Sequence, residues 1–477
     1  MNFLSRLILL CALCVSPIVQ ADNLPDLGEV SQSGFSPAAE RKLGDQVMLD
    51  IRSDPSYFDD PEVTEYLNNL GYRLASNSPD NRQDFEFFAL KDKTINAFAL
   101  PGGFIGVHTG TILASQTESE LASVLAHEIA HVTQHHIAQM IAQNKNTTIA
   151  SIAAIAVAIL AARSNSQVAD AALVSAQAAS IQSQINFTRQ HESEADRIGL
   201  QILDKAGFDT RGMETFFERL QKYNRIYDND APVYLRDHPL TSERIADIAN
   251  RVENTPYRQI PDSPSFLLIH AKLRALVLPP DEAVAYFADS LKQKRYRSEG
   301  AQHYGYATAL LKAKKYAMAD QEIALARSQM PPNAIIETLA AKIKLDEGQT
   351  KAALAIYKKN YEDYPLHKAL LYDYADALLR NRETSIALNL INQQLETSPD
   401  DYRLYELQAH AFALQGKVLS QHLALAEAQA HRGNLSAAIE QLQIALKSPD
   451  GDFYQLSSAE ARLKELRALD AERRKQQ

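Results

Sequence analysis

Two histidines four residues apart, with a glutamate directly after the first, form the pattern His127-Glu128-Ile-Ala-His131. On an α-helix this spacing stacks both imidazoles on one face, where their ring nitrogens can bind a single Zn²⁺. Glu128 lies at the edge of that face, where its carboxylate can take a proton from water and return it to a leaving amine. The pattern predicts one Zn²⁺ per chain and a peptide-hydrolysing site.

The alternative is a buried helix whose histidines are satisfied by hydrogen bonds alone. Leu121, Val124 and Leu125 indicate that this helix is largely buried. Burying two imidazoles and a carboxylate there is costly without a metal or complete hydrogen bonding. Thr117 and Glu120 are predicted to cap the start of the helix.

A catalytic zinc needs a third protein ligand. His135 is too far along the helix to share an ion with His127, because eight helical residues advance roughly 12 Å. His135 and His136 are therefore expected to be surface or supporting groups. The ligand is expected from the later segment Arg189–Gly199.

In that segment Glu192 and Asp196 share a helical face with Gly199, which would allow close packing on the first helix. Glu192 is predicted to bind the metal, and Asp196 to orient a histidine through its other ring N–H. Glu194 points away from this face and is expected to be solvated. The alternative is that these acids only offset the helix dipole.

Helices are predicted to begin at Ser36-Pro37 and Asp60-Pro61, where a capping residue precedes proline. Aromatic and β-branched residues then predict short strands at 84–90, 95–100 and 103–108. The third strand is interpreted as an edge to which an extended substrate peptide adds, and a plain core strand is the alternative. Its predicted substrate-binding residues are Phe104, Ile105, Gly106, Val107 and His108.

Beyond the acidic pair, His238-Pro239 lies in a predicted loop, with Arg244 six residues after the histidine. One hypothesis is that His238 approaches the metal, either to donate to the oxyanion of the reaction or to fill the open coordination position in a resting state. Arg244 could stabilise the same oxyanion. The alternative is a purely structural turn.

These motifs, together with the segment Asn96–Gly103, resemble the zinc metallopeptidase family that includes the CAAX prenyl proteases and HtpX. The resemblance covers roughly residues 36–250. It implies that His127, His131 and Glu192 bind zinc, that Glu128 is the general base, and that Asp196 supports a ligand. Those membrane enzymes have several spanning helices, and the sequence shows no comparable set.

Residues 1–21 are predicted to be a cleaved signal peptide, with Arg6 before the apolar run and Val19-Gln-Ala21 as the cleavage site. An uncleaved anchor is the alternative. Cys11 and Cys14 both lie in this segment, so the mature protein is expected to hold no disulfide. The apolar run 148–162 is short for a membrane span, which leaves a buried helix and a membrane-contacting helix equally open.

The C-terminal part has a repeat, since Pro331, Pro365 and Pro399 are spaced by 34 residues. Alanine occurs 12 and 24 residues before each of these prolines, where paired helices of a tetratricopeptide repeat touch. Pro449 marks a further, irregular copy. The pattern predicts an all-α solenoid with a concave surface for peptides or proteins.

The sequence thus predicts an α+β, mostly α chain: a gluzincin-type metalloprotease domain at 22–260, then a tetratricopeptide-repeat domain at 261–477. With 49 basic and 59 acidic residues the net charge is −10 and there is no basic tract, which argues against nucleic-acid binding.

This combination resembles periplasmic zinc proteases of Gram-negative bacteria that act in outer-membrane β-barrel assembly. The resemblance implies a location in the periplasm, with peripheral attachment to the outer membrane left open, and substrates that are unfolded or stalled outer-membrane proteins. It also implies chaperone-like help in assembly, with the repeats reaching the assembly machinery. The competing interpretation is a non-proteolytic chaperone or assembly adaptor with a closed or structural zinc site.

Overall fold

The computed structural model describes residues 36–80, 83–143, 189–226, 234–235, 238–253, 255 and 258–476. The predicted signal peptide and the apolar run 148–162 lie outside these residues. Within the described ranges, every helix is too short or too polar to cross a bilayer.

The first two helices begin where the sequence predicts. Helix α2 (Pro37–Ser53) is capped by Ser36, whose side chain accepts from the Ala39 N–H, and α3 (Pro61–Ala75) is capped by Asp60. In both helices proline occupies the first turn, where its missing N–H leaves no hydrogen bond unmade.

The sheet has three strands, β1 (Glu86–Leu90), β2 (Ala97–Leu100) and β3 (Phe104–His108), in the order β1-β3-β2. Strand β3 pairs in parallel with β1 and antiparallel with β2, and all five of its residues are buried. Of the two alternatives for residues 104–108, the edge strand that binds substrate is wrong and the core strand is confirmed, because both backbone edges of β3 are already hydrogen-bonded. Strand β2 is the edge strand whose neighbour is the metal-motif helix.

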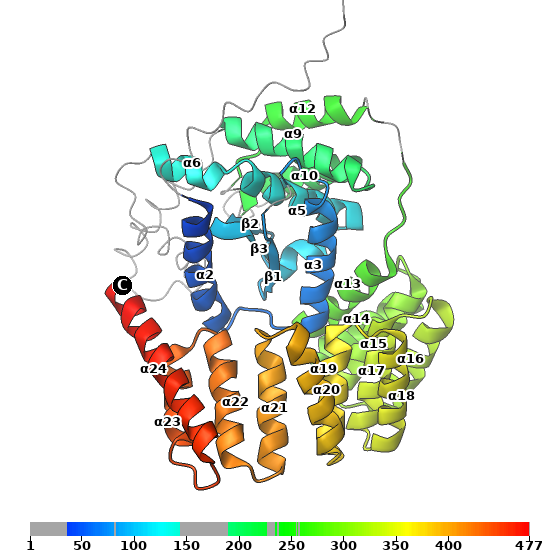
Figure 1. Ribbon diagram of the computed structural model, residues 1–477. Coiled ribbons are helices and arrows are strands. Elements are labelled where there is room, and N and C mark those ends of the chain that lie inside the picture. Colours follow the sequence, from blue (N-terminus) through cyan, green and yellow to red (C-terminus); the bar gives the residue numbers. More distant parts are fainter. Residues whose placement is uncertain are drawn as a thin grey trace, which may run out of the picture.

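The metal-motif helix α5 (Glu118–Thr133) follows α4 (Thr109–Ala114), and every residue of α5 is buried. It lies between the sheet and a layer formed by α9 (Arg189–Lys205), α10 (Arg211–Ile226) and α12 (Ser242–Glu253), with α6 (His136–Gln143) beside it (Figure 1). Thr117 caps α5 as predicted. The Glu120 carboxylate accepts from the Gln116 N–H, one residue before the cap, at 2.5 Å, and also binds Arg219 of α10, at 2.6 Å between Oε1 and Nη2.

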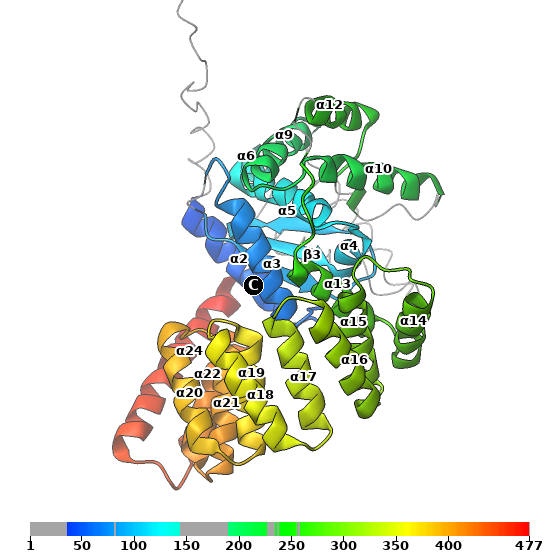
Figure 2. The same ribbon diagram turned by 90° about the vertical axis from the view of Figure 1, so that its right-hand side faces the viewer.

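The remaining helices pack in sequence as a curved array beneath the sheet (Figures 1 and 2). They are α13 (Pro264–Val277), α14 (Pro280–Lys292), α15 (Glu299–Lys312), α16 (Tyr316–Gln329), α17 (Ala334–Asp346), α18 (Thr350–Asp363), α19 (Lys368–Arg380), α20 (Thr384–Thr397), α21 (Tyr402–Leu414), α22 (Val418–His431), α23 (Leu435–Ala445) and α24 (Phe453–Gln476).

The repeat alanines lie where these helices touch. All six predicted positions are fully buried: Ala307, Ala319, Ala341, Ala353, Ala375 and Ala387. Each of the three repeat prolines comes two residues after the end of a helix, at α16, α18 and α20. The prediction of a helical solenoid after the peptidase part is confirmed.

The solenoid is tied to the metal-motif helix by a reciprocal pair of caps. Asp262 accepts from the Glu118 N–H at 2.7 Å, and the Glu118 carboxylate accepts from the Ser263 N–H at 3.0 Å. Ser263 in turn caps α13. One continuous apolar core also runs from α3 and α5 into α13–α17, so the domain boundary at residue 260 stays a prediction.

A second contact, made by a half-buried histidine, joins the solenoid to α3. His367 Nδ1, just before α19, lies 2.8 Å from Glu65 Oε2 on α3. Burial lowers the His367 pKa, but the hydrogen bond to Glu65 outweighs it and raises the pKa above its usual 6.5. Stability from the pair is therefore present below the unfolded-state pKa and lost as pH rises through the folded-state pKa.

We predict that His367→Gln lowers the melting temperature more at about pH 5 than at about pH 9. The control is His410→Gln, which replaces an exposed histidine of α21 and should shift the melting temperature little at either pH. A His367→Gln effect that is equal at both pH values would contradict this account.

Candidate metal centre

Helices α5 and α9 bring the three predicted ligands together. His127 Nε2 and His131 Nε2 lie 3.0 Å apart, and each is 3.5 Å from a carboxylate oxygen of Glu192. All three side chains are buried. The close approach depends on Gly199, where an added Cβ would lie 3.2 Å from the backbone nitrogen of His127. The sequence therefore predicts both that these three ligands meet and that Gly199 allows the two helices to pack closely.

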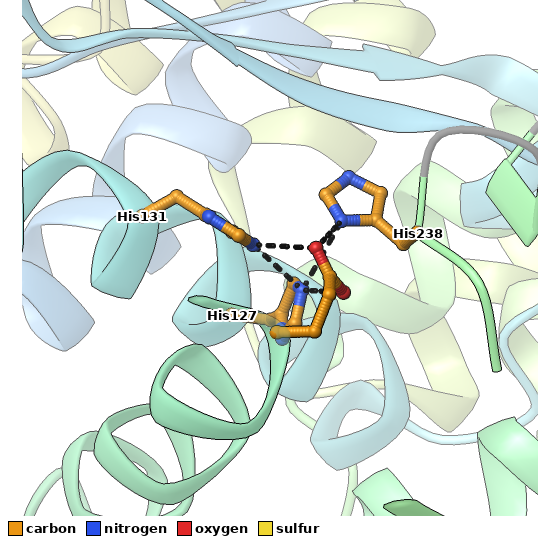
Figure 3. Close-up of side chains that lie close together, drawn as sticks. His127, His131 and His238 are labelled. Atoms are coloured by element: carbon orange, nitrogen blue, oxygen red, sulfur yellow. Dashed lines mark hydrogen bonds and ion pairs between the residues drawn. The ribbon is translucent and has the colours of Figure 1, made fainter. Parts of the chain in front are cut away.

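His238 completes the cluster as a fourth group. Its Nδ1 lies 3.0 Å from Glu192 Oε1 and 3.4 Å from His127 Nε2, and Figure 3 shows the three imidazoles converging. Ligand atoms of all four residues lie within 4.8 Å of one another. The backbone N–H of His238 donates to the Tyr234 carbonyl at 2.8 Å. The backbone N–H of Tyr234 donates to the carbonyl of Ile95, which lies just before β2, at 3.2 Å.

The donor set fits Zn²⁺, which prefers imidazole nitrogen and carboxylate oxygen in four-coordinate sites. His127 Nδ1 lies 3.0 Å from Asp196 Oδ1. This contact directs the Nε2 lone pair toward the cluster, as predicted for Asp196. With the histidines neutral, as metal ligands must be, the carboxylates of Glu128, Glu192 and Asp196 against one guanidinium, Arg244, leave two negative charges. A divalent cation would balance them.

Arg244 is held by the acidic pair. Its Nε and Nη2 donate to the two Asp196 oxygens at 2.7 and 2.8 Å, and its Nη1 lies 2.7 Å from Glu192 Oε2. Nη1 also donates to the Pro239 carbonyl at 2.9 Å. This geometry favours a role in positioning the two carboxylates and the His238 loop over the predicted contact with an oxyanion.

The charges around the cluster favour a cation. Burial lowers the pKa of His127, but hydrogen bonds to Asp196 and Glu192 outweigh it and raise the pKa to about 9. Burial raises the pKa of Glu192, yet the charge of His238 and the hydrogen bond from His127 hold it well below its usual value. Glu192 is thus an ionised oxygen donor, as a metal ligand must be.

His136 is a buried part of the centre that sequence reasoning left as a surface or supporting group. His136 Nδ1 lies 2.9 Å from His131 Nδ1, and its ring stacks on His191 at 4.4 Å between centroids. Glu194, expected to be solvated, lies 3.4 Å from His136 Nε2. His135 enables this, because its φ of 53° ends α5 and turns the chain back. The left-handed turn has no clear sequence signal.

Comparison with known proteins agrees with this geometry. Residues 61–252 match peptidase family M48, and residues 344–411 match a tetratricopeptide repeat. The chain is 35% identical to the beta-barrel assembly-enhancing protease of Escherichia coli K12, over 94% of this chain and 92% of that protein. It is 33% identical to the putative Vibrio cholerae protease of that name, over 92% of both chains.

A shorter relative matches only the peptidase part. It is the metalloprotease LoiP of Escherichia coli K12, 25% identical over 51% of this chain and 96% of LoiP. The fold and the buried cluster are thus those of a metallopeptidase joined to tetratricopeptide repeats. The chain belongs to the family of the beta-barrel assembly-enhancing proteases, whose peptidase part is of family M48.

The contact between His136 and His131 predicts a role in metal affinity. We expect His136→Ala to weaken Zn²⁺ binding about 10- to 100-fold, the usual effect of losing a group that orients a ligand. His136→Gln, which keeps a hydrogen-bonding group, should restore part of the affinity. Zn²⁺ affinity is measured by competition with a chelating dye.

The matched control is His135→Asn, because asparagine tolerates the left-handed backbone at this position. It should leave Zn²⁺ affinity unchanged. If His136→Ala bound Zn²⁺ as tightly as the unmodified protein, the positioning role would be refuted.

Proposed function

We propose that this protein is a zinc-dependent endopeptidase of the periplasm that acts on stalled or misassembled outer-membrane proteins and assists their assembly through its repeats. The observation that carries the enzymatic part is the convergence of His127, His131 and Glu192 beside the Glu128 carboxylate. The assembly role and the location are supported by the relatives named beta-barrel assembly-enhancing protease, which align along nearly the whole chain.

In the proposed mechanism, His127, His131 and Glu192 hold the metal, with Asp196 and Arg244 fixing their orientation. A bound Zn²⁺ would polarise the scissile carbonyl and acidify the attacking water. Glu128, fully buried at the edge of the helix face that carries both histidines, takes the proton from that water and delivers it to the leaving amine. The substrate peptide lies along the edge strand β2, which α5 contacts.

With zinc bound, His238 would fill the position that a hydrolytic zinc site keeps open for water. Its Nε2 also lies 3.5 Å from Glu128 Oε1, so the same ring blocks the base and the metal. We infer that the structure represents a resting form, which becomes active when the His238 loop moves away. This position supports the hypothesis that His238 fills the open coordination position in a resting state, rather than the hypothesis that it donates to the oxyanion.

The position of His238 as a possible fourth ligand also favours a second candidate function. Four protein ligands are typical of a structural zinc site, and a permanently closed site would leave only the binding role of a chaperone or assembly adaptor. The buried Glu128 carboxylate argues for catalysis, because a structural zinc has no use for an adjacent base.

The first test is Glu128→Gln, which removes the base while preserving size. We expect it to abolish cleavage of an unfolded outer-membrane protein while zinc content and melting temperature stay unchanged. Loss of a general base typically costs about 10²- to 10⁴-fold in rate. Cleavage is followed by gel electrophoresis with and without chelator. Undiminished cleavage by this variant would refute the role of Glu128 as the base, whereas absence of cleavage by the zinc-loaded unmodified protein would leave only the adaptor function.

The second test is His238→Ala, which frees the fourth coordination position. We expect faster peptide cleavage, by a factor equal to the reciprocal of the fraction of molecules that are open before the change. The rate is measured with a fluorogenic peptide at matched zinc occupancy. Slower cleavage would show instead that His238 assists the reaction.

A further inference from the structure

A cavity of about 220 Å³ lies between the loop before α5 and the first three solenoid helices, α13, α14 and α15. Three arginines line it, Arg274, Arg295 and Arg297, and no aspartate or glutamate is among the described residues that line it. This is unusual in a chain with a net charge of −10. By contrast, the larger cavity between α3 and the solenoid is lined by Glu62, Glu65, Glu118 and Asp363.

Two of the lining side chains carry buried N–H groups that have no acceptor among the described residues. These are Arg274 Nε and Gln302 Nε2, on the adjacent helices α13 and α15. A buried donor without an acceptor destabilises the fold, so an acceptor supplied by a ligand would be favoured here. Arg297 is already engaged by Asp262, at 2.9 Å from Nη1 to Oδ2, whereas Arg295 is exposed.

His270 adds no positive charge to the cavity at neutral pH. Its Nε2 lies 3.2 Å from the Leu113 carbonyl oxygen, so this nitrogen carries the proton and donates. Burial and the charge of Arg274 lower the His270 pKa to about 4, so the ring is neutral at neutral pH.

Four aromatic side chains also line the cavity, Phe266, Tyr286, Phe287 and Tyr296, beside the polar residues Ser115, Gln116 and Ser298. The Arg274 guanidinium lies 5.4 Å from the centre of the Tyr286 ring. The cavity thus suits a ligand that carries one anionic group and, close to it, one apolar group. A polypeptide whose last residue is apolar or aromatic has this combination at its carboxyl terminus.

We propose that this cavity binds the free carboxyl terminus of a polypeptide with an apolar or aromatic last residue. The Arg274 guanidinium and the Gln302 amide donate to the terminal carboxylate, and the aromatic residues receive the last side chain. Ser115 and Gln116, which border the cavity, directly precede the cap of α5. A bound terminus therefore contacts the loop that leads into the metal-motif helix. The proposal goes beyond hydrolysis and does not depend on it.

The test compares a short peptide ending in phenylalanine with the same peptide amidated at its carboxyl terminus. Binding to the mature full-length chain carrying Glu128→Gln is measured by fluorescence anisotropy, and mass spectrometry checks that the peptide stays intact. We expect amidation to weaken binding about tenfold, the effect of losing one charge-assisted contact. Arg274→Gln and Gln302→Leu should each weaken binding of the acid form and leave binding of the amide unchanged.

The matched control is Arg467→Gln, which removes one exposed arginine from α24, far along the solenoid, and should not alter binding. Equal affinity for acid and amide would overturn the proposal without any variant, so it stays testable even if Arg274→Gln unfolds. Arg274-dependent binding of inorganic phosphate or phosphatidylglycerol vesicles, with no preference for the peptide acid, would also overturn it. If Glu128→Gln retained cleavage, the hydrolytic mechanism would fail while this binding preference could still hold.

Discussion

The close contact of α5 with α9 is the constraint on which the metal centre depends. Gly199 faces the backbone at Ala126 and His127 and leaves little room for a side chain, because an added Cβ would lie only 3.2 Å from the His127 backbone nitrogen. Because the helices touch here, Glu192, two turns earlier on α9, reaches both imidazoles of α5. A larger residue at position 199 would separate the ligands.

The contact between α5 and α9 also buries charged side chains, which need partners. Carboxylates in a dry interior are stable only when paired and hydrogen-bonded. Arg244 supplies that pairing for Asp196 and Glu192, and it comes from α12, the last helix of the peptidase part. Its hydrogen bond to the Pro239 carbonyl also holds the loop that carries His238. The groups that orient Glu192 and Asp196 and the loop that carries His238 therefore belong to one network.

Local patterns make much of the fold predictable. Ser36 and Asp60 cap helices through contacts within one turn, and the repeat alanines are buried because each occupies the same place in its helix pair. The spacing of His127, His131 and Glu192 can also be interpreted locally, because each helix face is set by the helical period. The expected contact between the ligand-bearing faces of α5 and α9 then requires only close packing at Gly199.

The features that sequence reasoning misses depend on contacts between distant segments. Strand order is not encoded within a strand, so the prediction of an edge strand at 104–108 fails and these residues lie in the centre of the sheet. The contact of His136 with His131 depends on the left-handed turn at His135. The cavity at Arg274 forms only where the solenoid meets the loop before α5.

The most direct measurement is the zinc content of the purified mature protein, by mass spectrometry of the metal, beside that of Glu192→Gln. We predict one zinc ion per chain in the unmodified protein and a large loss in a Glu192→Gln protein that remains folded. A metal-free unmodified protein, or full zinc occupancy in Glu192→Gln, would contradict the claim that α5 and α9 together hold the ion.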